Sequence, residues 1–167
     1  MENKFAPISI SDRSVFLNHH SAVTSSSIEE INGRKVVVLK VGGGSRHGAI
    51  TAYDADTMKQ SVQLSGKLGI PFLTVLNTSG SDITEGPIGL HVWGSFAGEL
   101  ARLSGVVPTV AIVTGACVSG PSLILGLVDF VITTADAFAY VSGPGSVLEF
   151  TGVSVTKEEI GSPTLLA

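Results

Sequence analysis

Two short runs of small residues, NTSGSDITEG at 77–86 and TGACVSGP at 114–121, each follow an apolar run typical of a buried strand. They are about thirty-five residues apart, and their small side chains let a ligand approach the backbone N–H groups. Two such turns can together polarise one carbonyl oxygen, as an oxyanion hole does, without any catalytic side chain. A turn that opens a helix adds the positive end of the helix dipole.

A third glycine-rich loop, 42–48, follows the first apolar run and carries Arg46 and His47. Ligands of α/β sheets bind beyond the carboxyl ends of the strands, where all three loops are expected to lie. Either side chain can contact a phosphate or remain a solvated charge. The run GGGSRHG matches neither the Walker motif nor the dinucleotide-binding motif. The sequence has no His, Cys, Asp and Glu cluster with metal-ligand spacing, so no metal site is predicted.

Few side chains near these loops suit acid–base or nucleophilic chemistry. Cys117 precedes an expected helix, which would lower its thiol pKa, but no histidine is placed to pair with it. We interpret it mainly as a small packed residue. Asp82 and Glu85 are the carboxylates of the second loop, and Glu85 is expected to cap a helix or brace the loop, with acid–base work as the alternative. None of the loop serines stands in a G-x-S-x-G motif.

Alternating apolar strands and amphipathic helices predict an α/β fold with parallel pairing, covering helices and right-handed crossovers. Residues 1–32 are polar and are expected to form a flexible arm before a single domain at 33–167. Strands are predicted at 35–41, 71–76, 109–114, 129–133 and 139–141. Helices are predicted at 53–68 with Gly69 as C-cap, at 87–103, 121–127, 145–150 and 156–160. Cys117 to Gly120 is expected to be a turn, and the last five residues appear too few for an element.

Composition restricts the function further. The chain has 167 residues, 44% hydrophobic and only 14% charged, against a typical charged share of about 25%. Such low charge predicts a surface buried against another subunit, or half of a larger polypeptide. The net charge of −4 and the missing basic patch argue against nucleic-acid binding. One cysteine, no apolar leader segment and no apolar run near ~20 residues predict a cytoplasmic protein without a membrane span.

Several segments resemble the N-terminal half of the carboxyltransferase (β) subunit of biotin-dependent acyl-CoA carboxylases, in the crotonase superfamily. The run at 77–86 is similar to that family's Asp-Ser-Gly-Gly-Ala-Arg-Ile-Gln-Glu-Gly, and GACVSGP at 115–121 to its Gly-Pro-Cys-Ala-Gly-Gly-Ala. The other segments are SGVVP at 104–108, LVDF at 127–130, VSGP at 141–144 and VTKEEIG at 155–161. The match runs from about 32 to 161 in the family's order.

The resemblance implies a crotonase-like spiral of β-β-α units that binds an acyl-CoA thioester and meets biotin on a biotin carboxyl carrier protein. Ser119 and Gly120 would supply amides that hold the biotin carbonyl, and Gly80 and Ser81 would form the other turn of the site. Residues implied near the ligands are Gly44, Arg46, Gly48, Ser79 and Cys117. Implied partners are a second carboxyltransferase half and further copies of the chain, as a trimer or a dimer of trimers.

The chain departs from the family pattern at informative positions. Asp82 replaces an arginine, Ser79 and Ser119 each replace a glycine, and Pro121 cannot donate an N–H. The leading hypothesis is a carboxyltransferase half in which backbone amides polarise the substrate and biotin does the proton chemistry. A thioester decarboxylase or hydrolase without biotin, and a degenerate assembly subunit without catalysis, remain as alternatives.

Overall fold

The computed structural model describes residues 15–16, 23–44 and 46–166, so most of the expected arm lies outside the described residues. The predicted boundary of that arm at 32 is wrong. Thr24–Ile31 forms strand β2, which pairs antiparallel with β3, Arg34–Gly42. The turn between them is Asn32–Gly33, whose φ angles are both positive (50° and 77°). Asn-Gly is the usual sequence of a two-residue hairpin turn, and it was the missed signal.

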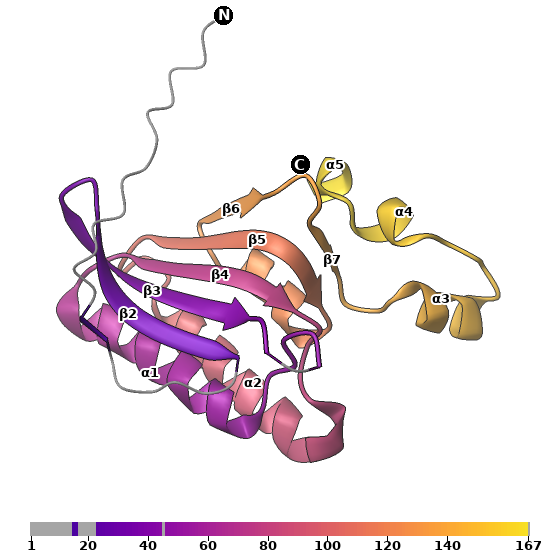
Figure 1. Ribbon diagram of the computed structural model, residues 1–167, viewed down its shortest axis with the longest axis horizontal. Coiled ribbons are helices and arrows are strands. Elements are labelled where there is room, and N and C mark those ends of the chain that lie inside the picture. Colours follow the sequence, from indigo (N-terminus) through magenta and orange to yellow (C-terminus); the bar gives the residue numbers. More distant parts are fainter. Residues whose placement is uncertain (1–14, 17–22, 45, 167) are drawn as a thin grey trace, which may run out of the picture.

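A seven-stranded sheet is the centre of the described part of the chain (Figure 1). Its order is β1-β2-β3-β4-β5-β6, and β7 also pairs with β5. From β3 onward the pairs are parallel, as predicted. The remaining strands are β1 (Val15–Phe16), β4 (Phe72–Thr78), β5 (Thr109–Val118), β6 (Phe130–Thr133) and β7 (Phe138–Tyr140).

Two long helices, α1 (Ala52–Leu68) and α2 (Pro87–Arg102), lie side by side on one face of the sheet (Figure 1). Thr51 and Asp54 form a capping box at the start of α1, and Gly69 ends it in the left-handed conformation, as predicted. Side chains of β3, β4 and β5 that point to these helices make the fully buried core, including Val37, Phe72 and Ala111. This layer fixes the positions of the loops at the carboxyl ends of the strands.

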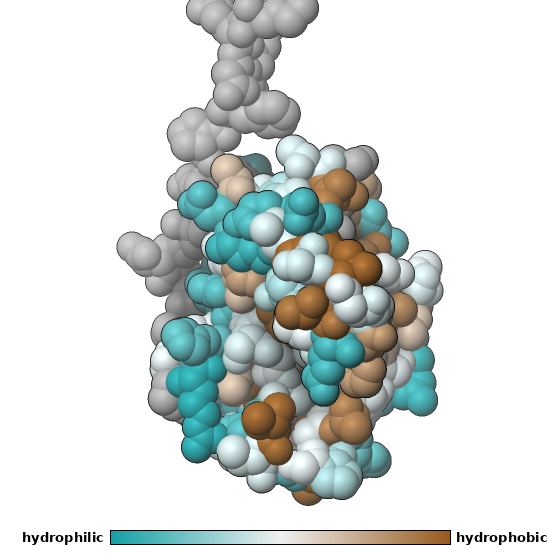
Figure 2. All heavy atoms as spheres, turned by 90° about the vertical axis from the view of Figure 1, so that its right-hand side faces the viewer, coloured by the Kyte–Doolittle hydropathy of each residue, from teal (hydrophilic) through white to brown (hydrophobic). Residues whose placement is uncertain are grey.

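The C-terminal part of the chain is much less buried. Its helices are η2 (Gly120–Gly126), α3 (Pro144–Thr151), α4 (Lys157–Gly161) and α5 (Pro163–Leu166). The other short helix, η1 (Ile83–Glu85), lies earlier in the chain, between β4 and α2. Helix α3 has no buried residue, and its Phe150 is 85% exposed. Figure 2 shows several hydrophobic patches on the face of the molecule that lies to the right in Figure 1. Such a surface fits the contact with another chain or segment that the low charge predicts.

Three predicted elements differ in detail. Cys117 and Val118 continue strand β5 rather than forming a turn, because they pair with β7. Residues 120–126 form a 3-10 helix, and the short end segment does form a helical turn, α5. The other predicted strands and helices are confirmed, with ends shifted by at most four residues.

Candidate functional site

The first turn, at the end of β4, is built around the buried hydroxyl of Thr78. Thr78 Oγ1 donates to the carbonyl oxygen of Gly48 (2.6 Å) and accepts from the Gly80 N–H (3.1 Å). The Ser79 N–H donates to the His47 carbonyl (3.0 Å). The N–H groups of Ser79 and Gly80 are therefore already used within the protein.

Ser81 is different because its neighbours hold it in place while its own N–H stays unused. The Ile50 N–H donates to the Gly80 carbonyl and the Asp82 N–H donates to the Ile50 carbonyl, both at 2.8 Å. These two bonds form a parallel bridge between Ile50 and Ser81. Within the described ranges, the Ser81 N–H has no acceptor. Among residues 79–82, Ser81 thus has the one N–H without an acceptor in the described part of the chain, which makes it the candidate donor for a ligand.

The carboxylate of Asp82 joins the first turn to loop 42–48. It accepts from the Thr84 N–H (2.9 Å) and hydroxyl (2.7 Å), and it forms an ion pair with Arg46. These hydrogen bonds from Thr84, helped by the Arg46 guanidinium, hold the pKa of Asp82 below its usual 3.8 although desolvation opposes them. Arg46, which the sequence offered as a phosphate contact, is paired with a carboxylate here.

The second turn, after β5, also leaves one amide unused. The Ser119 N–H donates to the Tyr140 carbonyl of β7 (3.0 Å), so this amide, expected to serve a ligand, is taken. The next N–H, that of Gly120, has no acceptor in the part of the chain that the structure describes. Ser119 has a φ angle of +63°, a strained value for a residue with a Cβ.

The two turns lie in direct contact. A Cβ atom placed on Gly80 would be 3.0 Å from both the Ser119 Cβ and the Val118 carbonyl oxygen. Helix α2 touches both turns: its Gly89 packs against Ser81, and its Trp93 packs against Gly120. These two helix residues are four positions apart, a rise of about 6 Å, and so lie on the same face of α2.

The first loop comes equally close to the end of β4. Cβ atoms on Gly42 and Gly48 would lie 2.7 and 2.6 Å from the carbonyl oxygen of Asn77, so neither position tolerates a side chain. The Asn77 side chain in turn accepts from the Ala116 N–H of β5 (3.1 Å). Gly44 lies in the exposed part of this loop. The three loops predicted at the carboxyl ends of the strands thus meet at one place.

Cys117 and Glu85, which the sequence offered for chemistry, have structural roles instead. Burial of Cys117 in the core raises the pKa of its thiol to about 12, so it stays protonated and away from ligands. Glu85 accepts from the Ala52 N–H (2.7 Å) and so braces the first turn against the start of α1, the preceding helix. Among the described residues, no three His, Cys, Asp or Glu side chains gather as metal ligands.

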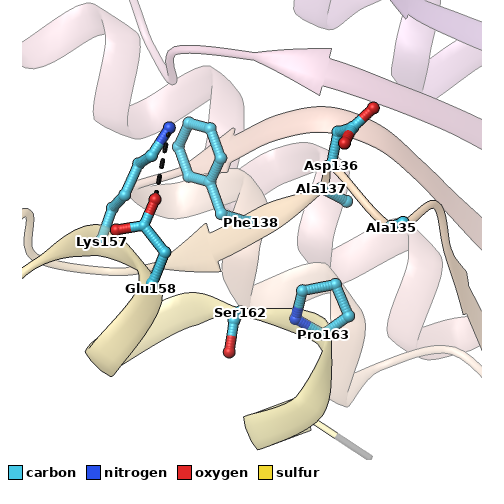
Figure 3. A pocket seen from close by; sticks show the side chains of 8 residues that line it. All are labelled: Ala135, Asp136, Ala137, Phe138, Lys157, Glu158, Ser162 and Pro163. Carbon is cyan, nitrogen blue, oxygen red and sulfur yellow. Dashed lines mark ion pairs between the residues drawn. The ribbon is translucent and has the colours of Figure 1, made fainter.

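A separate hollow of about 250 Å³ lies between the β6–β7 connection and helices α4 and α5 (Figure 3). Lys157 pairs with Glu158 (3.7 Å) and lies over the ring of Phe138, with its Nζ 5.1 Å from the ring centre. Asp136 stands on the opposite side of the hollow (Figure 3). With these charges of both signs, the hollow favours neither anions nor cations, and it contains none of the site residues predicted from the sequence.

Trp93 and Thr78 are absent from the residues predicted from the sequence, although both shape the turns. The available signal for Trp93 was its spacing of four from Gly89, which places both on one face of α2.

No described helix is both long and apolar enough to cross a membrane.

The parallel sheet, its covering helices and the paired turns define a crotonase-like fold of the carboxyltransferase type. The chain belongs to the Carboxyl transferase domain family, whose model matches residues 20–166. It is 36% identical over 121 residues to the methylmalonyl-CoA carboxyltransferase 12S subunit of Propionibacterium freudenreichii subsp. shermanii, over 72% of this chain and 22% of that one. It is 30% identical over 136 residues to the human mitochondrial propionyl-CoA carboxylase beta chain, over 78% and 24%.

Among solved structures, a transcarboxylase 12S structure with methylmalonyl-coenzyme A and methylmalonic acid bound matches with a TM-score of 0.80 and 28% identity. That match covers 85% of this chain and 28% of the other. The chain therefore spans about a quarter of the length of these relatives.

Proposed function

We propose that the two turns bind the carbonyl group of an acyl-CoA thioester during transfer of a carboxyl group between biotin and that thioester. The observation that carries this proposal is the pair of unused amides, one in each touching turn, in a chain of the carboxyl transferase family. Relatives named for methylmalonyl-CoA and propionyl-CoA support a short-chain acyl-CoA as the substrate class.

The chemistry of the thioester explains why two amides suffice. When its α-carbon loses a proton and gains a carboxyl group, negative charge builds on the carbonyl oxygen in between. The Ser81 and Gly120 N–H groups, which have no acceptor among the described residues, are the donors that we assign to that oxygen. The family resemblance implied Ser119 and Gly120 as donors to the biotin carbonyl. Because the Ser119 N–H is bonded to Tyr140, we instead assign one amide from each turn to the thioester.

The surrounding side chains support polarisation rather than proton transfer by the protein. The Cys117 thiol is buried and protonated, and the Asp82 carboxylate is ionised and paired with Arg46. Biotin on a carrier protein would supply the carboxyl group and the basic nitrogen. The chain's own contribution is to bind, orient and polarise.

The partners follow from the length of the match. Since the matches cover only about a quarter of the relatives, we propose that this domain works beside a second carboxyltransferase half and a biotin carrier. The exposed apolar side chains of β6 and α3 support burial against such a partner or against further copies of the chain.

Calorimetry with two matched ligands tests the proposed function. Propionyl-CoA carries the carbonyl group, and S-propyl-CoA, a thioether, lacks it. We expect propionyl-CoA to bind in the micromolar to millimolar range, about tenfold or more tightly than the thioether, because the thioether leaves both amides unpaired. Equal affinity for the two ligands would contradict carbonyl binding at the turns.

Two other results favour the alternative functions. Release of CO2 or CoA from malonyl-CoA without biotin would support a decarboxylase or hydrolase. Failure of the folded protein to bind acetyl-CoA, propionyl-CoA and malonyl-CoA would contradict the proposal and support an assembly role.

A further inference from the structure

Trp93 lies with the face of its indole ring against the second turn. A Cβ atom placed on Gly120 would be 2.8 Å from Trp93 Nε1 and 3.0 Å from each of the two ring carbons bonded to it. Because its distances to these three atoms are nearly equal, this Cβ position lies over the face of the ring and not in the ring plane. The indole N–H, which lies in the plane, therefore points along the surface of the turn.

The indole N–H has no acceptor among the described residues, and the side chain is only partly buried. The ring also contacts fully buried Phe96, with a distance of 5.9 Å between the ring centroids. A Cβ atom is about 2.5 Å from its own backbone nitrogen, so Trp93 Nε1 is within about 5 Å of the Gly120 nitrogen. Two donors at that separation can both reach one oxygen atom.

We propose that the Trp93 Nε1–H is a third donor of the site and binds the same carbonyl oxygen of the thioester as the Gly120 N–H. This inference rests on the proposed function and deepens it. A ring that contacts both Phe96 of the core and Gly120 of the turn keeps its N–H in place before the ligand arrives, so little ordering entropy is lost on binding. The indole also covers the turn and limits the access of water to it.

The matched variants are Trp93→Phe, which keeps an aromatic ring but removes the N–H, and Leu90→Ala, which truncates an exposed side chain (72%) of the same helix. By calorimetry we expect Trp93→Phe to bind propionyl-CoA about three- to tenfold more weakly. Its affinity for S-propyl-CoA should remain that of the wild type, because the thioether offers no oxygen at this position. Leu90→Ala should bind both ligands like the wild type.

Trp93 is the only tryptophan of the chain, so its emission reports on the site in the wild-type protein. S-propionyl-N-acetylcysteamine, a thioester without adenine absorption, should shift or quench the emission, whereas the corresponding propyl thioether should not. This measurement decides the question even if Trp93→Phe does not fold.

The outcomes separate the two proposals. If the wild type prefers propionyl-CoA to the thioether but Trp93→Phe shows the same preference, the third donor is wrong and the proposed function stands. An emission unchanged at saturating thioester would overturn the inference in the same way. If the wild type binds no thioester, both proposals are overturned.

Discussion

The two turns of the site are held in place by different kinds of interaction. The first turn is held by side-chain hydrogen bonds from Thr78 and Asp82 to neighbouring loops. The second is held by shape: Ser119 has a strained backbone, and Gly120 fits closely under the Trp93 ring. Each turn leaves one amide without an acceptor among the described residues. The comparison predicts that the second turn is destabilised most by added side-chain volume, and the first by removal of a hydrogen-bonding group.

Adding a methyl group to the second turn should have the largest effect. The Cβ of Gly120→Ala would meet the Trp93 ring at 2.8 Å, so the ring or the turn must move. We expect the free energy of unfolding to fall by up to about 3 kcal/mol in chemical denaturation. The Kd for propionyl-CoA should rise by about tenfold or more in calorimetry, because the Gly120 N–H is displaced.

Gly126→Ala is the matched control, since this residue ends the same 3-10 helix and a Cβ there meets nothing within 4 Å. It should leave both stability and binding unchanged. A Gly120→Ala protein as stable and as tightly binding as Gly126→Ala would contradict the packed second turn.

Removing a hydroxyl from the first turn should have the next largest effect. Thr78→Val keeps the shape of a fully buried side chain but leaves the Gly48 carbonyl and the Gly80 N–H without their partner. Such orphaned groups cost about 2 kcal/mol, which urea denaturation can measure.

The same substitution four residues earlier in β4 is expected to change the free energy of unfolding in the opposite direction. Thr74 of β4 is also fully buried, but within the described residues its Oγ1 has no hydrogen-bond partner. We expect Thr74→Val to raise the free energy of unfolding by about 1 kcal/mol, because the unpaired hydroxyl is replaced by a methyl group. Equal effects of the two substitutions would show that the hydroxyl of Thr78 does not hold the first turn.

This contrast also shows what could be predicted from the sequence. The β-branched run at 36–38 and the glycine after α1 were enough to place β3 and the end of that helix, because these signals act locally. Whether a backbone N–H has an acceptor depends on residues that are distant in the sequence. The Ser119 N–H is taken by Tyr140, and the fate of the Gly80 N–H depends on a hydroxyl that also holds Gly48, thirty residues earlier. The three converging loops were therefore predictable, but the free amides were not.

Relieving strain in the second turn should have a smaller effect. Ser119 keeps a φ angle of +63°, a conformation that glycine adopts with little cost. Ser119→Gly should raise the free energy of unfolding by about 1 kcal/mol, the relieved strain less the added freedom of the unfolded chain. Ser119→Ala, the control, retains the Cβ and should match the wild type in thermal and urea denaturation. If both substitutions stabilise equally, the hydroxyl rather than the backbone is the source of the strain.

The smallest expected effect concerns the charge of the first turn and depends on pH. The pKa of Asp82 is lower in the folded protein than its usual value of 3.8, mainly through its hydrogen bonds with Thr84 and with help from Arg46. A lowered folded-state pKa means that the carboxylate stabilises the fold fully above about pH 4, and that this contribution is lost as the pH falls through the folded value. Melting temperatures of Asp82→Asn should therefore lie below those of the wild type at pH 6, and the gap should close below pH 4. Asp136→Asn, at an exposed residue away from both turns, should show no such closing gap.

Because the Asp82 N–H still binds the Ile50 carbonyl in Asp82→Asn, the Ser81 amide stays in position and propionyl-CoA binding should stay close to that of the wild type. A large loss of binding would mean that the charge itself, and not only the backbone it holds, acts on the ligand.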